Sequence, residues 1–259
     1  MTVVAGMEAM RLLPAVEAAA RQAGELILEV YAGDFQVRGK ADASPVTEAD
    51  EQAERCIVAA LHALDPGVPV VAEEAAARGQ SPVVGARFWL VDPLDGTREF
   101  VSRNCEFTVN IALIEDGLPT LGVVLVPVTE ALYAGVVGQG AWLHAQGQRR
   151  AIRCRQALQQ GWVLASSRSH GDEAALAAWL AGRTVARRIC AGSSLKFGLL
   201  ACGQADAYPR LGRTMEWDTA AGHAVLRAAG GEVTTLDGAP LRYGKPGFEN
   251  PHFVARGLV

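Results

Sequence analysis

Hydrophobic positions recur at helical spacing in two segments near the N-terminus. Across residues 7–31 an apolar side chain returns every three or four residues, which predicts one long amphipathic helix. A second helix is predicted to begin near Thr47 and to end at Asp65-Pro66-Gly67, because proline and glycine stop a helix. Thr47 and Asp50 have the T-x-x-D spacing of a capping box, so a purely structural role stands beside any chemical role for them.

The pattern then changes to short apolar runs bounded by turn residues, which is typical of strands. Residues 68–72 and 88–91 form two such runs. Three longer runs, at 107–114, 121–127 and 131–137, alternate with turn signals and predict an antiparallel meander. The sequence therefore predicts a mainly antiparallel N-terminal sheet flanked by helices.

A polar, arginine-rich stretch at 149–160 interrupts this pattern and is the predicted domain boundary. Beyond it, strands predicted at 162–165 and 187–191 alternate with helices, which indicates an α/β layer. The helices are predicted at residues 172–180, 194–202 and 219–229. We therefore expect an α+β N-terminal domain over residues 1–152 and a smaller α/β C-terminal domain over residues 153–259.

Composition and charge narrow the function classes. The 259 residues, half of them hydrophobic and a fifth charged, have ordinary globular composition and suffice for one large domain or two modest ones. A net charge of −4 and a pI of about 5.8 argue against a nucleic-acid scaffold, which usually shows a basic face. They do not argue against a small phosphorylated substrate, because local cations can dominate its site.

The sequence predicts neither export nor membrane insertion. Its first residues lack the basic and long apolar regions of a secretory signal, and the longest apolar runs are too short for a transmembrane helix. The five cysteines are scattered and odd in number, which favours reduced thiols over a disulfide framework or a zinc site. We expect a cytoplasmic protein, with a peripheral position at the inner membrane as the alternative.

An acidic segment stands directly after the apolar run at 88–91. Asp92 and Asp95 are three residues apart, and two carboxylates at the end of a buried strand are costly unless a cation neutralises them. Gly96 allows a sharp turn, and a helix that begins at Gly96-Thr97 would present free N–H groups to a phosphate. Carboxylates and a carbonyl are the hard oxygen ligands that Mg²⁺ prefers. Taken alone, such a turn is better explained by Asp95 or Thr97 capping a helix.

Two further acidic positions repeat this arrangement. The apolar run at 70–72 leads into Glu73 and Glu74, and Asp218 precedes the helix predicted at 219–229. Each has a plain structural interpretation, as a solvated pair at a strand end and as a helix N-cap respectively. Singly these signals are weak, and their order along the chain is what makes them recognisable.

In this order the motifs resemble those of the inositol-monophosphatase superfamily, the lithium-sensitive, magnesium-dependent sugar and nucleotide phosphatases. The resemblance spans residues 41–231. It is carried by Trp89-Leu90-Val91-Asp92-Pro93-Leu94-Asp95-Gly96-Thr97 and, downstream, by Trp217-Asp218-Thr219-Ala220-Ala221-Gly222. It implies a layered αβαβα sugar-phosphatase-like fold with a metal-binding N-terminal domain and a substrate-binding C-terminal domain. Ala72 departs from the family pattern, which commonly shows Ser or Gly there.

Within the superfamily the pattern is most similar to bacterial 3'(2'),5'-bisphosphate nucleotidases of the CysQ type. Arg98-Glu99-Phe100 carries this likeness, together with residues 40–50, 193–197 and 207–210. It implies removal of the 3'-phosphate from 3'-phosphoadenosine 5'-phosphate (PAP), and by extension from its sulfated analogue (PAPS), giving AMP and phosphate from PAP. The alternative on the same fold is an inositol monophosphatase or a sugar bisphosphatase. A catalytically silent metal- or nucleotide-binding protein is disfavoured, because every expected ligand type is present.

The resemblance implies a site that holds two or three Mg²⁺ ions. Its ligands would be Glu73, Asp92, Asp95, Asp218 and the Leu94 carbonyl. One ion would activate the attacking water and another would neutralise charge on the leaving 3'-oxygen. Asp50 would hydrogen-bond Thr97, and this pair, with Glu73, would orient the water and accept its proton.

The implied substrate is a small phosphorylated nucleotide. The residues implied in binding it are Gly96, Thr97, His170, Ser193, Lys196 and Arg210. Plainer interpretations stand for two of these, His170 as an ordinary loop residue and Lys196 as a solvated surface residue lying over Phe197. For Tyr208, core packing is favoured over stacking on adenine. Homodimers are widespread in the superfamily, which makes a homodimer the implied assembly.

Overall fold

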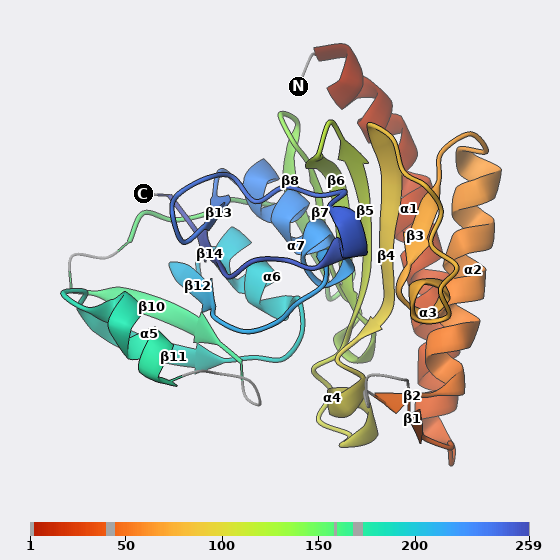
Figure 1. The fold of residues 1–259 in the computed structure, drawn as a ribbon, viewed down its shortest axis with the longest axis horizontal. Coiled ribbons are helices and arrows are strands. Elements are labelled where there is room, and N and C mark those ends of the chain that lie inside the picture. The colour runs from red at the N-terminus through yellow and green to blue at the C-terminus, as the bar shows by residue number, and fades with distance from the viewer. Residues whose placement is uncertain (1–2, 40–44, 158–159, 168–172, 259) are drawn as a thin grey trace.

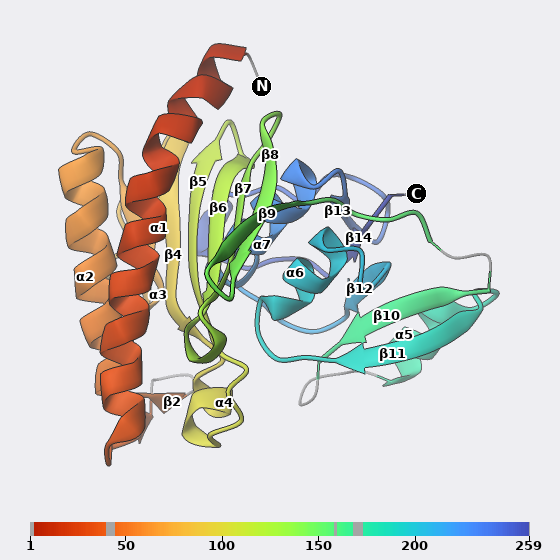
Figure 2. The same cartoon turned by 180° about the vertical axis from the view of Figure 1, so that it is seen from behind.

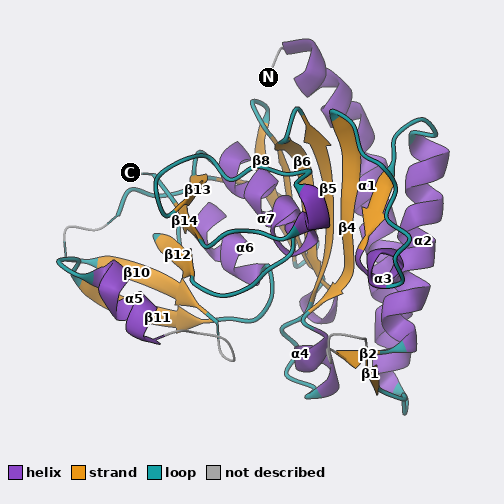
Figure 3. Ribbon diagram, viewed as in Figure 1, coloured by secondary structure: helices purple, strands orange, loops and turns teal. Residues whose placement is uncertain are grey.

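The computed structural model describes residues 3–39, 45–157, 160–167 and 173–258, and Figure 3 shows its helices and strands. The helices are α1 (Val3–Ala32), α2 (Glu48–Leu64), α3 (Glu73–Ala77), α4 (Thr97–Val101), α5 (Glu173–Leu180), α6 (Leu195–Ala201) and α7 (Glu216–Ala228), with 3-10 turns η1 (Pro127–Thr129) and η2 (Pro246–Phe248). The two-residue strands β1 (Arg38–Gly39) and β2 (Pro45–Val46) pair with each other. The remaining strands form two larger sheets.

The larger sheet has seven strands in the order β3-β4-β5-β6-β7-β8-β9. Its strands are β3 (Val70–Ala72), β4 (Arg87–Asp95), β5 (Thr108–Glu115), β6 (Leu118–Val126), β7 (Ala131–Val136), β8 (Gly140–Ala145) and β9 (Gln148–Ile152). β3 runs parallel to β4, and every other neighbouring pair is antiparallel. The predicted meander is therefore confirmed in β5, β6 and β7.

Strands β8 and β9 correct the sequence analysis, which predicts no strand between residue 137 and the polar boundary stretch at 149–160. β9 occupies the first residues of that boundary stretch. Its side chains before Ile152 are exposed, so it lacks the apolar run by which strands were recognised. The division of the chain at residue 152 stays a prediction.

The smaller sheet has five strands in the order β11-β10-β12-β14-β13. They are β10 (Trp162–Ser166), β11 (Val185–Cys190), β12 (Ala207–Arg210), β13 (Glu232–Thr235) and β14 (Phe253–Arg256). β11, β10 and β12 are parallel, whereas β14 is antiparallel to both of its neighbours. The expected α/β layer is present, although β12, β13 and β14 were not predicted as strands.

Helices separate and cover the two sheets. α1 and α2 lie side by side on one face of the larger sheet, as Figure 2 shows most clearly. α7 packs on the opposite face, with α6 beside it, and the smaller sheet lies beyond them (Figure 1). α5 packs on the smaller sheet, where Trp179 contacts Trp162 of β10. The expected layered fold is confirmed, and no helix among the described residues has both the length and the apolar character that crossing a membrane requires.

Two glycines let α7 lie unusually close to the larger sheet. A Cβ on Gly122 of β6 would stand 2.3 Å from the carbonyl oxygen of Ala221, and one on Gly135 of β7 would stand 2.7 Å from the Cα of Val225. Both neighbours are backbone atoms of α7, so any larger residue would push the helix away. This close approach holds the middle of α7 against the larger sheet, and Asp218 lies one turn before the contact at Ala221.

Candidate active site

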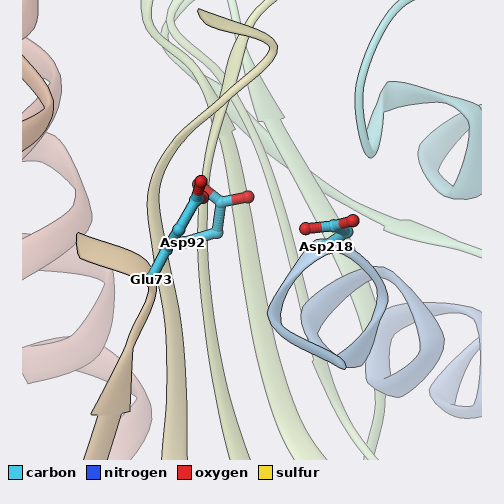
Figure 4. Close-up of side chains that lie close together, drawn as sticks. All are labelled: Glu73, Asp92 and Asp218. Atoms are coloured by element: carbon cyan, nitrogen blue, oxygen red, sulfur yellow. The ribbon is translucent and has the colours of Figure 1, made fainter. Parts of the chain in front are cut away.

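Three carboxylates from separate parts of the chain lie together beside the end of β4. Glu73 is the first residue of α3, Asp92 belongs to β4 and Asp218 lies in the first turn of α7. One carboxylate oxygen of each lies within 4.8 Å of the others. Figure 4 shows Glu73 and Asp92 on one side of a space and Asp218 on the other. The structure thus brings together three of the four carboxylates that the sequence analysis nominates as metal ligands.

β4 leaves its regular pairing with β5 between Asp92 and Asp95, where the register shifts. Pro93 has no N–H to give to a neighbouring strand, and the N–H of Leu94 turns back to Oδ1 of Asp92 at 3.1 Å. The end of this buried strand is therefore an irregular turn that carries two acids, as the sequence indicates.

The protonation equilibria of these acids are strongly displaced. Burial raises the pKa of Asp92 and of Asp218 well above the usual value, and the nearby carboxylates of Glu73 and Asp95 raise both further. Burial also raises the pKa of Asp95, against the opposing charge of Lys196. A divalent cation would remove the repulsion and favour the ionised forms. Since the donors are hard oxygens, the site fits Mg²⁺.

Asp95 stands beside this cluster, held by hydrogen bonds from two other elements. Its Oδ2 accepts hydrogen bonds from the Ser194 amide at 2.7 Å and from Nδ2 of Asn110 at 3.3 Å. The Ser194 hydroxyl donates to the carbonyl oxygen of Asp218 at 2.6 Å. Ser194 therefore ties the acidic turn after β4 to the first turn of α7.

The sequence analysis missed Ser194 and Asn110, and also Thr108, whose hydroxyl lies 3.5 Å from Oδ2 of Asp95. One signal was available for two of them. Thr108 and Asn110 are buried polar residues two apart in β5, whose other residues are apolar up to Ile114, and this spacing places both side chains on the same face. Ser194 gives no comparable signal, because its contacts depend on how α6 and α7 pack.

Asp50 and Thr97 meet as the resemblance implies. The Thr97 hydroxyl lies 3.1 Å from Oδ1 of Asp50 and 3.3 Å from the Leu94 carbonyl oxygen. Oδ2 of Asp50 accepts from the N–H and the hydroxyl of Thr47, so the capping box is also confirmed. The structural and the chemical interpretations of Asp50 are compatible, since each uses a different carboxylate oxygen.

The start of α7 corrects the expectation that Asp218 precedes the helix. α7 begins at Glu216, and the Asp218 carboxylate accepts a hydrogen bond from the Met215 amide at 2.8 Å, which closes the first turn. Glu216, fully buried, in turn accepts bonds from the amides of Gly244 and Lys245 and from the Lys245 ammonium. The bond from the Met215 amide to Asp218 closes the first turn at this earlier position, and the Glu216 contacts tie that turn to Gly244 and Lys245.

Gly96 has a backbone conformation and surroundings that favour glycine. Its φ of 92° lies in the left-handed region, and a Cβ would stand 2.2 Å from the Ser193 hydroxyl oxygen. That hydroxyl lies 2.8 Å from the carbonyl oxygens of Asp95 and Glu106. Directly after Gly96, Thr97 opens α4 as predicted.

A cavity of about 280 Å³ opens beside the carboxylates. Glu73, Asp95 and Asp218 line it together with the predicted substrate-binding residues Gly96, Thr97, Ser193, Lys196 and Arg210. His170, also predicted to bind substrate, lies outside the described residues. The structure therefore places every described residue of the predicted substrate set at one cavity.

The interpretation of Lys196 as a solvated surface residue is wrong. Its side chain is buried, and its ammonium donates to the carbonyl oxygens of Ala191 (3.1 Å) and Ser193 (2.6 Å). The same ammonium lies 5.1 Å from the centre of the Tyr208 ring. Burial lowers the pKa of Lys196 to about 8, although the charge of Asp95 opposes this shift. Tyr208 packs against Phe197 in the core, as favoured.

Arg210 lines the cavity, and its guanidinium is held in place by two hydrogen bonds. Its two terminal nitrogens donate to the Ser167 hydroxyl at 3.0 Å and to the Arg213 carbonyl oxygen at 3.1 Å. Its Nε is buried and has no hydrogen-bond partner among the described residues. Arg210 is therefore a cation at the cavity whose direction is fixed by its contacts with Ser167 and Arg213.

Comparisons with known proteins agree with this geometry. The model of the inositol monophosphatase family matches residues 9–255. The chain is 48% identical over 237 residues to 3'(2'),5'-bisphosphate nucleotidase CysQ of Escherichia coli (strain K12), covering 90% of this chain and 95% of the relative. It is 40% identical over 245 residues to the protein of the same name from Buchnera aphidicola, covering 92% and 91% respectively.

Solved structures give the same answer at the level of the fold. The crystal structure of CysQ from Bacteroides thetaiotaomicron, a bacterial member of the inositol monophosphatase family, superposes with a TM-score of 0.81 at 39% identity, covering 97% of each chain. An inositol monophosphatase from Anabaena superposes with a TM-score of 0.75 at 25% identity, covering 96% of this chain and 91% of the other.

Proposed function

The chain belongs to the inositol monophosphatase family, and from that premise we propose that it is a 3'(2'),5'-bisphosphate nucleotidase. It removes the 3'-phosphate of PAP, and by the same chemistry that of PAPS, and releases AMP and inorganic phosphate from PAP. One observation carries the proposal beyond similarity: Glu73 and Asp218 of the carboxylate cluster line the same cavity as the buried Lys196 and as Arg210. Acids for a metal and cations for a second phosphate suit a bisphosphorylated substrate.

The proposed cofactor is Mg²⁺, with two or three ions per site. The residues that would hold it are Glu73, Asp92, Asp95, Asp218 and the Leu94 carbonyl. When bound there, Mg²⁺ supplies positive charge that offsets the carboxylate repulsion, polarises the phosphate and acidifies water. Asp218 comes from the C-terminal segment, so the proposed metal-binding (1–152) and substrate-binding (153–259) parts share the metal site.

The chain supplies the proton acceptor through Thr97 and Asp50. When the Thr97 hydroxyl donates to Oδ1 of Asp50, its oxygen lone pairs are free to accept a hydrogen bond from the attacking water. As the water oxygen bonds to phosphorus, its proton passes to Thr97 and the Thr97 proton to Asp50. The P–O3' bond breaks as the bond from the water oxygen to phosphorus forms, and the leaving 3'-oxygen takes a proton from a solvent water molecule. Glu73, which lines the same cavity, helps to orient the water.

The substrate is oriented by groups around the same cavity. The Gly96 and Thr97 amides bind the scissile phosphate, and the Arg210 guanidinium, which lines the same cavity, binds the second phosphate. Lys196 is held in place by hydrogen bonds to two backbone carbonyls, and its charge adds to that of Arg210. A role for His170 in the same pocket stays a prediction.

The test is a comparison of phosphate release from PAP, inositol 1-phosphate and fructose 1,6-bisphosphate, with Mg²⁺ and with EDTA. We expect PAP to be the fastest substrate, no turnover in EDTA, and a loss of at least about 100-fold in Asp95→Asn. Asp34→Asn, which neutralises an exposed carboxylate, is the matched control and is expected to keep wild-type activity. Metal-independent turnover, or faster hydrolysis of inositol 1-phosphate, would overturn the proposal.

A further inference from the structure

Glu54 is a buried carboxylate that the proposed chemistry does not use. It lies on α2 one helical turn after Asp50, and its side chain is 6% exposed. Because residues four apart share a helix face, α2 directs both carboxylates toward the same side. Asp50 reaches Thr97, whereas Glu54 reaches α3, the short helix that Glu73 begins.

The contacts of Glu54 are those of a helix cap supplied from another helix. Its Oε2 accepts from the amide of Glu74 at 2.7 Å and from that of Ala75 at 3.3 Å. These are the second and third residues of α3, the two amides that an N-cap side chain normally satisfies. Ala72 occupies the N-cap position of α3 and makes no side-chain cap bond. Glu54 therefore does for α3 what Ala72 cannot do.

The other oxygen of Glu54 secures the far end of the same helix. Its Oε1 accepts from the guanidinium of Arg78 at 3.0 Å, and Arg78 is the C-cap residue of α3. A single carboxylate thus contacts both ends of a five-residue helix. A helix this short has too few internal hydrogen bonds to hold its own direction, so its orientation depends on such contacts.

We propose that Glu54 is a positioning residue for Glu73: by capping α3 it directs the Glu73 carboxylate toward Asp92 and Asp218. This inference rests on the proposed metal-dependent function. Glu54 itself is not placed at the metal cluster, and it acts through the backbone of α3. Loss of its cap lets the first turn of α3 unwind or rotate, and the carboxylate of Glu73 then leaves the position it shares with the other two.

The experiment measures Mg²⁺ binding in two single variants and in their double variant, where the second substitution should rescue the first. We expect Glu54→Leu to raise the Mg²⁺ dissociation constant, measured by titration calorimetry, by about 10–100-fold. Ala72→Ser places a capping hydroxyl on α3 itself, since the backbone at Ala72 already has the extended geometry of an N-cap. In the Glu54→Leu background Ala72→Ser is expected to restore most of the affinity, whereas alone it changes little.

Two further variants keep the test decisive. Glu51→Leu, on the same helix, removes the ion pair to Arg38 without touching α3 and is expected to bind Mg²⁺ as wild type does. If Glu54→Leu does not fold, Glu54→Gln keeps one acceptor for the α3 amides and is expected to show a smaller loss in the same direction. Folding itself is followed by the melting temperature in EDTA.

The outcomes separate this inference from the proposed function. A Glu54→Leu protein that melts at a lower temperature but binds Mg²⁺ with unchanged affinity would show a merely structural role and overturn the inference. Failure of Ala72→Ser to rescue binding would overturn it as well. If the wild type binds Mg²⁺ but does not hydrolyse PAP, the proposed substrate is wrong. The Mg²⁺ affinities of the variants then still test the positioning role of Glu54. A wild type that binds no Mg²⁺ would overturn both.

Discussion

The Thr97 hydroxyl lies 3.1 Å from Oδ1 of Asp50, a residue 47 positions earlier in the chain. The other oxygen of Asp50 is fixed by the N–H of Thr47 at 2.8 Å and by its hydroxyl at 2.7 Å. The carboxylate that faces Thr97 is therefore held by the start of α2. A group with a fixed direction is a better proton acceptor than a mobile one, because no reorganisation is needed during the reaction.

Removal of this hydrogen-bonded pair should slow the chemical step far more than it weakens metal binding. Thr97→Val and Asp50→Asn are each expected to lower kcat by about 10²–10⁴-fold, the range for loss of a general base. Thr97→Ser keeps the hydroxyl and should keep most of the activity. Steady-state kinetics with PAP and Mg²⁺ titrations check this. A parallel loss of Mg²⁺ affinity would instead assign the pair to holding the turn after β4.

Metal binding should be coupled to the protonation of Asp92 and Asp218. Their pKa values are raised in the folded protein, so the metal-free folded state binds more protons than the unfolded state between the ordinary and the raised pKa. Their contribution to stability is present below that interval and is lost as the pH rises through it. Mg²⁺ replaces these protons, so the rise in melting temperature that it causes should grow with pH.

The measurement is a set of melting curves with Mg²⁺ and with EDTA, from mildly acidic to mildly alkaline pH. Asp92→Asn removes one of the coupled acids and is expected to flatten the pH dependence of the EDTA curves. A Mg²⁺-induced shift that stays constant across this range would contradict the coupling.

The close packing of α7 on the larger sheet predicts a large effect of a single methyl group. Gly122→Ala would place a Cβ 2.3 Å from the Ala221 carbonyl oxygen and 2.7 Å from the Cβ of Ala224. Overpacking against atoms that cannot move aside should lower the free energy of unfolding by about 1–3 kcal/mol. Gly85→Ala, which has nothing within 4 Å, is the control and should stay within about 0.5 kcal/mol. Equal urea unfolding midpoints for the two variants would contradict this account.

The sequence predicts best where local rules decide the structure. The capping box of Thr47 and Asp50 is local, and so is the helix that Thr97 opens after Gly96, and both are present. The contact between Asp50 and Thr97 was reached only through family resemblance, because no pattern in one sequence joins two distant residues. The same holds for the meeting of Asp92 with Asp218, which depends on how α7 lies on the sheet.

The sequence-based predictions failed at positions where packing between distant segments, rather than local sequence preference, decides the structure. The side chain of Lys196 has the length and charge of a surface residue, but α6 places it beneath Tyr208 and beside two carbonyl groups. β9 has exposed side chains before Ile152 and is a strand because β8 supplies its partner. The sequence gives no signal for Glu54, since nothing local distinguishes a carboxylate that caps a neighbouring helix from one that faces water.

Because Lys196 is buried, we expect its contribution to the free energy of unfolding to increase as the pH rises above about 8. Its pKa falls from 10.5 to about 8 in the folded protein, so between these values the unfolded state holds more protons and folding becomes more favourable as the pH rises. Below about pH 8 the residue destabilises the metal-free fold by roughly 3 kcal/mol, and this penalty disappears toward pH 10.5.

Lys196→Met removes the titrating group, although it also loses hydrogen bonds to Ala191 and Ser193, a loss that does not depend on pH. Tyr208, whose pKa burial raises from 10.0 to about 12, lowers stability only above about pH 10 and is present in both proteins, so its effect cancels in the difference. Urea unfolding in EDTA should therefore show a free-energy difference between wild type and Lys196→Met that shifts in favour of wild type across this window. A difference that stays constant would mean that Lys196 keeps its ordinary pKa.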